Sequence, residues 1–154
     1  MPTTPDEYYW KALDNAMAYT VPRPTVLVVN YPSNPTAETV DLAFYERLVA
    51  WARENKVWVL SDLAYSELYY DGKPTRSILE VPGAKDVAVE FTSMSKTYSM
   101  AGWRMGFAVG NPTLISALSR VKRSRRSRSR PPPRSTGRRT WSRKTARATS
   151  TGVT

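Results

Sequence analysis

A single lysine stands in a setting suited to covalent chemistry. Lys96 follows an apolar segment, has Ser93 and Ser95 just before it, and precedes Arg104 by eight positions. A lysine amine forms Schiff bases with carbonyl compounds, and it loses its proton most readily when it is desolvated or flanked by a cation. The stretch therefore indicates an amine beside an anion site, with an ordinary solvated surface lysine as the alternative.

Composition narrows the chemistry further. The chain contains no histidine and no cysteine, which excludes a Ser-His-Asp relay, a Cys-His pair and metal sites built on imidazole or thiolate. General acid–base work must fall to Lys, Asp, Glu or Tyr, and we expect no metal site. No apolar run approaches the roughly 20 residues that span a bilayer, and the first seven residues lack the character of a signal peptide. We expect a cytoplasmic protein without a membrane partner.

The elements that must position these residues alternate between strands and helices. A helix is predicted between Asp6 and Val21, a longer one from an N-cap at Thr39 to about Asn55, and a third from Asn111 to about Val121. Strands are predicted at 26–29, 57–60, 87–91 and 104–109, with an irregular segment at 65–82. The continuously apolar strands, such as 26–29, are typical of a buried parallel sheet. The pattern predicts an α/β fold with a mostly parallel sheet.

Polar residues follow three of the predicted strands. Asn34, Asp62 and Lys96 each lie just past the end of a different strand. In parallel sheets, ligands bind outside the carboxyl ends of the strands. The three side chains are therefore expected to converge on one rim, although each has an ordinary alternative. Asn34 suits a turn, Asp62 suits a cap, and Lys96 suits the surface.

Four ordered motifs carry a family resemblance. They are Asn-Pro-Thr at 34–36, Asp-Leu-Ala-Tyr at 62–65, Ser-Met-Ser-Lys at 93–96 and Gly-Trp-Arg-Met-Gly at 102–106. In order and spacing they resemble the large domain of fold-type I pyridoxal-phosphate aminotransferases of class I/II. The sequences of residues 30–36 and 90–100 most resemble those of the branch that holds the alanine and LL-diaminopimelate aminotransferases. The resemblance covers roughly residues 6–122 and implies part of that domain's sheet with its flanking helices.

The resemblance assigns the covalent and ring-binding roles. Lys96 would form the internal aldimine with pyridoxal 5'-phosphate and later shuttle a proton between the substrate Cα and the cofactor. Asp62 would pair with the pyridine nitrogen, which keeps the ring an effective electron sink. Asn34 and Tyr65 would both hydrogen-bond the 3-oxygen of the ring. Without the resemblance, Tyr65 could equally be a core aromatic residue.

The same resemblance places the phosphate contacts. Ser93 and Arg104 would hold the phosphate, with Arg104 making a charge-assisted contact, and Ser95 would assist. Arg104 alone could instead be a structural ion-pair partner. The remaining conspicuous aromatic residues are interpreted as core packing: Trp51, Trp58 and Trp103.

The family fold is larger than this chain, which predicts a partial large domain over residues 1–122. By resemblance, the substrates are an amino acid and a 2-oxo acid, and the full-length family forms homodimers. Segments expected to precede and follow this region hold the ring-stacking aromatic residue and the arginine that binds the substrate carboxylate. We therefore expect impaired amino-group transfer, with a catalytically inert cofactor-binding remnant as the alternative.

The end of the chain differs sharply in composition. Of the 23 basic residues, 13 lie between Arg120 and Arg147, where no acidic residue occurs, and the remaining 10 stand against 13 acidic residues. Residues 123–154 are rich in Arg, Ser and Pro, which predicts a disordered tail. Translation of a GC-rich gene in a shifted reading frame would produce a sequence of this composition. The other interpretation is a basic arm that binds nucleic acid by counterion release, but no specific nucleic-acid partner is expected.

Overall fold

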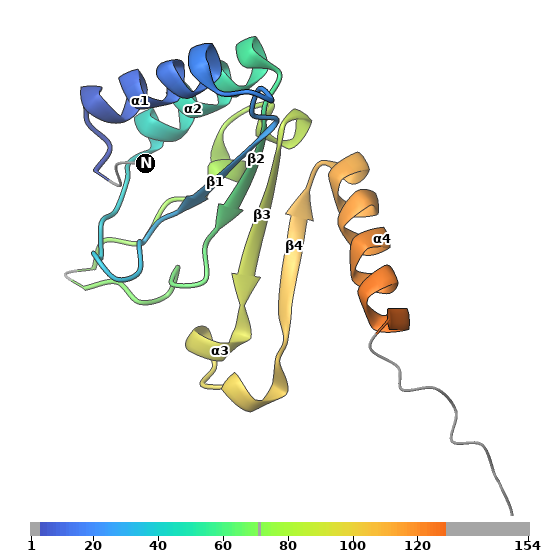
Figure 1. The fold of residues 1–154 in the computed structure, drawn as a ribbon. Helices are drawn as coiled ribbons and strands as arrows, with labels where there is room; N and C mark the ends of the chain where they lie inside the picture. The colour runs from blue at the N-terminus through green and yellow to red at the C-terminus, as the bar shows by residue number, and fades with distance from the viewer. Residues whose placement is uncertain (1–3, 71, 129–154) are drawn as a thin grey trace, which may run out of the picture.

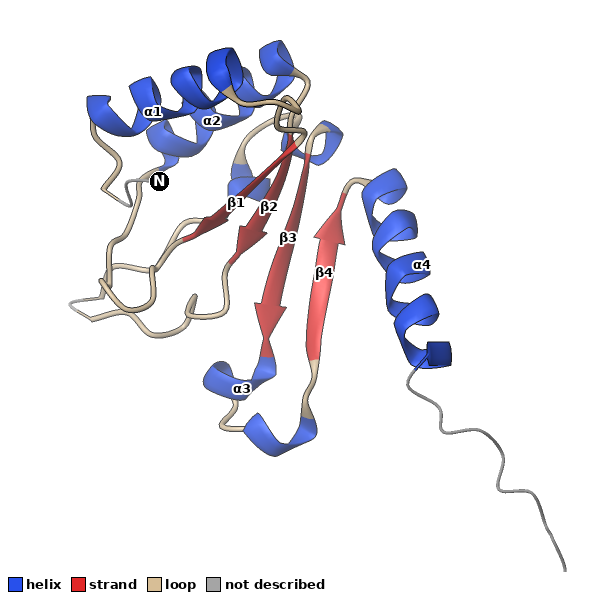
Figure 2. Ribbon diagram, viewed as in Figure 1, coloured by secondary structure: helices blue, strands red, loops and turns tan. Residues whose placement is uncertain are grey.

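The computed structural model describes residues 4–70 and 72–128, which form one sheet with helices on it (Figure 1). The strands are β1 (Val26–Asn30), β2 (Trp58–Asp62), β3 (Ala88–Ser93) and β4 (Gly106–Gly110), in that spatial order. β1, β2 and β3 run parallel, and β4 runs antiparallel to β3. This arrangement confirms the predicted α/β class and the mostly parallel sheet. Figure 2 shows the same view with helices in blue and strands in red.

Two helices lie on one side of the sheet, next to β1 and β2 (Figure 1): α1 (Glu7–Tyr19) and α2 (Leu42–Asn55). The first helix lies where it was predicted, and the Asp6 carboxylate caps it by accepting the Tyr9 N–H at 3.0 Å. The predicted cap of α2 at Thr39 is wrong, because the Asp41 carboxylate accepts the Phe44 N–H at 2.9 Å. Asp and Thr are both good N-caps, and the helix begins only after the aspartate.

The core lies between these helices and one face of the sheet. Tyr45, Leu48 and Ala52 of α2 are fully buried against Val59 of β2 and Ala88 of β3. The expectation that 26–29 is fully buried is wrong. Val26 is 45% and Val28 65% exposed, whereas Val29 is 4% exposed. Alternate side chains of a strand point to opposite faces, and among the described residues nothing buries Val26 and Val28 on the second face.

The fourth strand begins at Gly106 rather than at the predicted Arg104. Arg104 has a φ of 53° and ends the short 3₁₀ turn η3 (Ala101–Trp103) that precedes the strand. A Cβ at Gly106 would lie 2.5 Å from the Thr92 carbonyl oxygen, so the close β3–β4 approach requires glycine here. Trp103 is 72% exposed, which contradicts its predicted core role, while Trp51 and Trp58 are partly buried.

Four further elements complete the described chain. Two 3₁₀ turns, η1 (Ile78–Glu80) and η2 (Ala84–Asp86), lie between β2 and β3, and a short helix α3 (Met94–Thr97) follows β3. The last helix, α4 (Pro112–Arg128), runs beyond the predicted end at Val121. It thus includes residues 123–128 of the predicted tail, and residues 129–154 lie outside the described part of the chain.

Candidate functional site

The carboxyl ends of the three parallel strands form a common rim (Figure 1). The register places Asn30 opposite Asp62, and Asp62 opposite Phe91, so the three strands end nearly level. Asp62 is exposed at this rim, and its Oδ1 accepts the Ala64 N–H at 3.2 Å. The predicted convergence therefore begins with the backbone, because level strand ends bring the loops that follow them together.

Three of the predicted site residues meet through their side chains. The Asn34 Nδ2 donates a hydrogen bond to the Tyr65 Oη over 2.9 Å. The Lys96 Nζ lies 5.6 Å from the centroid of the Tyr65 ring, which is within the range of a cation–π contact. Tyr65 is half-buried, whereas Asn34 and Lys96 are exposed. The arrangement presents an amide, a phenol and an amine to a common space.

Lys96 is carried by α3, directly after β3. Ser93 ends β3 and caps α3, where its Oγ accepts the Ser95 N–H at 3.2 Å. The Thr97 hydroxyl lies 3.5 Å from the Ser93 carbonyl oxygen. Ser93 and Ser95 are both half-buried. The local turn therefore fixes the backbone on either side of the lysine while its amine stays accessible.

Arg104 approaches the same region from the other direction. Ser93 faces Gly106 in the β3–β4 register, and the Met94 N–H donates to the Met105 carbonyl oxygen over 3.2 Å. The Arg104 guanidinium is exposed and lies 3.5 Å from the Ala101 carbonyl oxygen. Within the described residues, it shares no hydrogen bond with the Ser93 side chain. The sheet brings the two backbones together and leaves the guanidinium able to turn toward a ligand.

The sequence motifs did not identify one polar residue at the rim. Asn30, the last residue of β1, donates from Nδ2 to the Asp62 carbonyl oxygen over 3.0 Å, and its Oδ1 accepts the Asn34 N–H at 3.0 Å. It therefore contacts the segments that carry two of the predicted site residues. An asparagine before a turn-rich segment is a signal for such side chain–backbone bonding, but the sequence does not indicate its partners.

A buried polar network lies beneath the rim. The Glu90 carboxylate of β3 accepts hydrogen bonds from the Ser77 hydroxyl at 2.6 Å, the Ile78 N–H at 3.1 Å and the Ser61 hydroxyl at 3.3 Å. Glu90 is only 6% exposed. Burial raises the pKa of Glu90, and the hydrogen bonds from Ser77, Ile78 and Ser61 partly oppose that rise. Ser61 immediately precedes Asp62, so the network joins the strands that lead to Asp62 and to Lys96.

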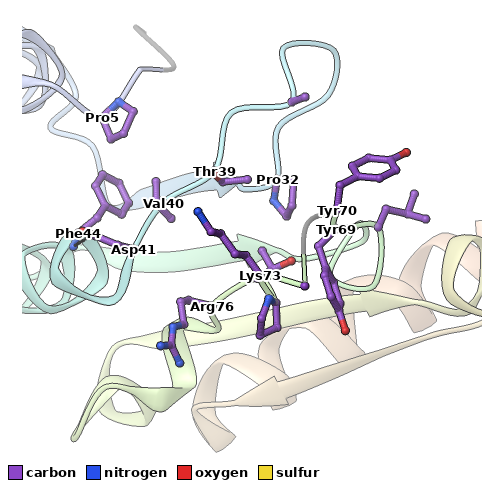
Figure 3. A pocket seen from close by; sticks show the side chains of 15 residues that line it. Pro5, Pro32, Thr39, Val40, Asp41, Phe44, Tyr69, Tyr70, Lys73 and Arg76 are labelled. Carbon is purple, nitrogen blue, oxygen red and sulfur yellow. Dashed lines mark hydrogen bonds between the residues drawn. The ribbon is translucent and has the colours of Figure 1, made fainter.

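A cavity is lined by a set of residues that differs from the predicted site residues. It has a volume of about 880 Å³ and opens between the 37–41 segment and the 68–76 segment (Figure 3). Its lining includes Tyr69, Tyr70, Lys73 and Arg76, and Arg76 is paired with Glu80 over 3.1 Å. None of the seven predicted site residues lines it. We place the candidate site at the rim because the side chains of Asn34, Tyr65 and Lys96 meet there. Cavity size alone supplies no chemistry.

Comparison with known proteins decides the family. The family model described as aminotransferase class I and II matches residues 7–136. The chain belongs to the class I and II aminotransferase family. This match confirms the resemblance inferred from the four motifs. The matched region begins close to the expected start and extends past Lys122, where the end of the large-domain part was predicted.

Individual class I and II aminotransferases agree with this assignment. The glutamate-pyruvate aminotransferase AlaC of Escherichia coli (strain K12) is 51% identical over 114 residues, covering 74% of this chain and 28% of that protein. An LL-diaminopimelate aminotransferase of Nitratidesulfovibrio vulgaris (strain DP4) is 57% identical over 102 residues, covering 65% of this chain and 26% of that protein. The chain therefore spans under a third of the length of these relatives.

A solved aminotransferase structure supports the fold. The aminotransferase from Staphylococcus aureus superposes with a TM-score of 0.63 at 34% identity, covering 67% of this chain and 27% of that one. In the part of this chain that the structure describes, no helix is long and apolar enough to cross a membrane. The same residues contain no group of three or more acidic, histidine or cysteine side chains arranged to hold a metal ion.

Proposed function

We propose that the rim of this aminotransferase chain is a binding site for pyridoxal 5'-phosphate, with Lys96 as the residue that holds it covalently. The observation that carries the proposal is the grouping of Lys96, Tyr65 and Asn34. The Asn34–Tyr65 hydrogen bond is 2.9 Å long, and the Lys96 amine lies 5.6 Å from the Tyr65 ring. Asp62 lies on the same rim, at the end of β2, which is the neighbour of the strand β3 that leads to Lys96.

The side chains present fit the chemical groups of this cofactor. The amine of Lys96 suits its aldehyde, and the exposed carboxylate of Asp62 suits a protonated pyridine nitrogen. The Asn34 amide and Tyr65 hydroxyl are donors for an anionic ring oxygen, because the Tyr65 Oη already accepts from Asn34 and keeps its own proton to donate. Arg104 and Ser93, with Ser95, supply a guanidinium and hydroxyl groups for the phosphate.

We assign amino-group transfer between an amino acid and a 2-oxo acid as the reaction of the full-length protein. Pyridoxal phosphate, when bound, supplies a ring that withdraws electrons from the substrate Cα. Once the substrate has displaced it, the Nζ of Lys96 would take the proton from the substrate Cα and deliver it to C4′ of the cofactor. Asp62 would keep the ring nitrogen protonated, and Asn34 and Tyr65 would orient the ring. A catalytically inert cofactor-binding chain is the second candidate, because this chain spans under a third of the relatives.

The setting of the site follows from the same proposal. We propose that residues 1–122 form part of the cofactor-binding large domain and that a shifted reading frame explains the basic sequence after Lys122, although α4 continues to Arg128. The full-length protein would act as a cytoplasmic homodimer. Reading the two other frames of the gene after Lys122 tests the tail, since family-like sequence should reappear in one of them.

Absorption spectroscopy tests the cofactor proposal. We expect a band at the violet edge of the visible spectrum when pyridoxal phosphate is titrated into the purified chain. Lys96→Ala should abolish the band, while Lys85→Ala should leave it unchanged because Lys85 is an exposed lysine on η2, away from the rim. The absence of a band in the unaltered chain, or an equal band in Lys96→Ala, would overturn the assignment.

A further inference from the structure

We infer that Asn30 is a positioning residue of the Lys96 site, which it serves by holding Asn34 and Asp62 in fixed relation. This inference rests on the proposed function, in which Asn34 and Asp62 contact different parts of one cofactor ring. The Asn30 side chain makes its hydrogen bonds to the backbones of both residues.

The geometry of the Asn30 amide is fully specified. Its Nδ2 donates to the Asp62 carbonyl oxygen over 3.0 Å, and its Oδ1 accepts the Asn34 N–H at 3.0 Å. A flipped amide would place its NH₂ group against the Asn34 N–H and its oxygen against the Asp62 carbonyl. Only one orientation satisfies both partners, so the side chain acts as a rigid link.

The Asn30 side chain joins the end of a strand to an irregular connection. Asp62 ends β2, directly opposite Asn30 in the parallel register. Asn34 belongs to the connection that leads from β1 to α2, where the sheet ladder no longer fixes the backbone. The Asn30 bond therefore ties the Asn34 backbone to the end of β1, and the Asn34 side chain donates to Tyr65.

Such a link affects binding because the site has two sides. A ring held between Asp62 and the Asn34–Tyr65 pair needs both at fixed distances, and displacement of supporting residues by about 1 Å is enough to weaken a site. Without Asn30, the Asn34 N–H loses its acceptor and the 31–41 connection gains freedom. The Asn34 amide then spends less time where it can donate to the ring oxygen.

Two substitutions separate the halves of the link. Asn30→Ala removes both hydrogen bonds, whereas Asn30→Asp keeps the acceptor for the Asn34 N–H and loses the donor to the Asp62 carbonyl. Asn55→Ala is the matched control. Asn55 is also half-buried, with its Nδ2 donating to the Trp51 carbonyl oxygen over 3.0 Å and its Oδ1 lying 3.4 Å from Arg23 Nη2, but it lies at the end of α2.

The experiment measures the pyridoxal phosphate affinity of the full chain and the pH midpoint of the visible band of the bound cofactor. Urea unfolding first establishes that each variant is folded under the conditions of the binding measurement. We expect Asn30→Ala to weaken affinity about tenfold, the scale of one or two lost hydrogen bonds. Its pH midpoint should shift in the same direction as that of Asn34→Ala. The double variant should be little worse than Asn34→Ala, and Asn55→Ala should match the unaltered chain. Asn30→Asp should also lose affinity, because a carboxylate oxygen replaces the amide donor and faces the Asp62 carbonyl oxygen.

The possible results are distinguishable. If the unaltered chain binds no pyridoxal phosphate, the proposed function fails and the inference fails with it. If the unaltered chain binds but Asn30→Ala binds equally well, only the role of Asn30 is overturned. A weaker Asn30→Ala variant with an unmoved pH midpoint and an effect additive to that of Asn34→Ala would also overturn it, because that result describes a general structural role.

Discussion

Replacing Glu90 with alanine removes the acceptor of three buried hydrogen bonds at once. Their donors are the Ser77 hydroxyl, the Ile78 N–H and the Ser61 hydroxyl. The two hydroxyls can rotate toward other acceptors, but the Ile78 N–H is fixed in the backbone of a fully buried residue. An unsatisfied buried donor costs roughly 1–3 kcal/mol, and each weakened hydroxyl contact adds about 0.5–1 kcal/mol. We expect Glu90→Ala to lower the free energy of unfolding by about 3 kcal/mol.

Glu90→Gln separates the hydrogen bonds from the charge. The glutamine carbonyl can accept from Ile78 and Ser61, and its NH₂ group can donate to the Ser77 oxygen. All three contacts then persist without a buried charge, so we expect a free energy of unfolding within about 1 kcal/mol of the unaltered protein at pH 7.

The pH dependence has a definite sign. Because burial raises the pKa of Glu90 above its ordinary value of 4.5, the folded protein binds this proton more tightly than the unfolded chain. The resulting stability is fully present below pH 4.5 and is lost as pH rises through the folded pKa. Glu90→Gln should lack this loss, so its advantage over the unaltered protein should grow with pH.

Urea unfolding followed by tryptophan fluorescence between pH 4 and pH 8 measures these differences. Glu54→Gln is the control, since Glu54 is exposed on α2. The reasoning is refuted if Glu90→Ala is as stable as Glu90→Gln, or if Glu90→Gln loses stability with pH as the unaltered protein does.

Three further substitutions test local features, each by urea or thermal unfolding. Asp41→Ala removes the side-chain cap on the Phe44 N–H and should cost about 1 kcal/mol, while an unchanged midpoint would argue against the cap. Tyr9→Phe removes a buried hydroxyl that has no hydrogen-bond partner among the described residues and should raise stability by about 1 kcal/mol; a loss would indicate a hidden partner. Gly106→Ala places a Cβ 2.5 Å from the Thr92 carbonyl oxygen, so it should separate β3 from β4 and reduce pyridoxal phosphate binding as well as stability.

The sequence predicted the rim because parallel strands impose it. Once the strands before Asn34, Asp62 and Lys96 are identified, their carboxyl ends must share one edge, and the structure places all three there. The Asn34–Tyr65 hydrogen bond could not be obtained in this way. It depends on how two irregular loops fold, and neither loop has a periodic pattern.

Other features were undetermined for different physical reasons. Thr39 and Asp41 are both good helix caps, so sequence alone could not choose between them. The exposure of Val26 and Val28 depends on which sheet face the helices cover, and a continuous apolar run carries no information on that choice. Asn30 has the residue type of a turn former, yet its role depends on Asp62, which lies 32 positions along the chain.

The most direct test of the central claim is to find where pyridoxal phosphate attaches. The chain is mixed with the cofactor, reduced with borohydride and digested, and the modified peptide is located by mass spectrometry. Our account predicts a single reduced adduct on Lys96, at a yield that falls strongly in Asp62→Ala and Asn34→Ala. Modification spread over exposed lysines such as Lys85 and Lys73, with Lys96 no more reactive than they are, would contradict it.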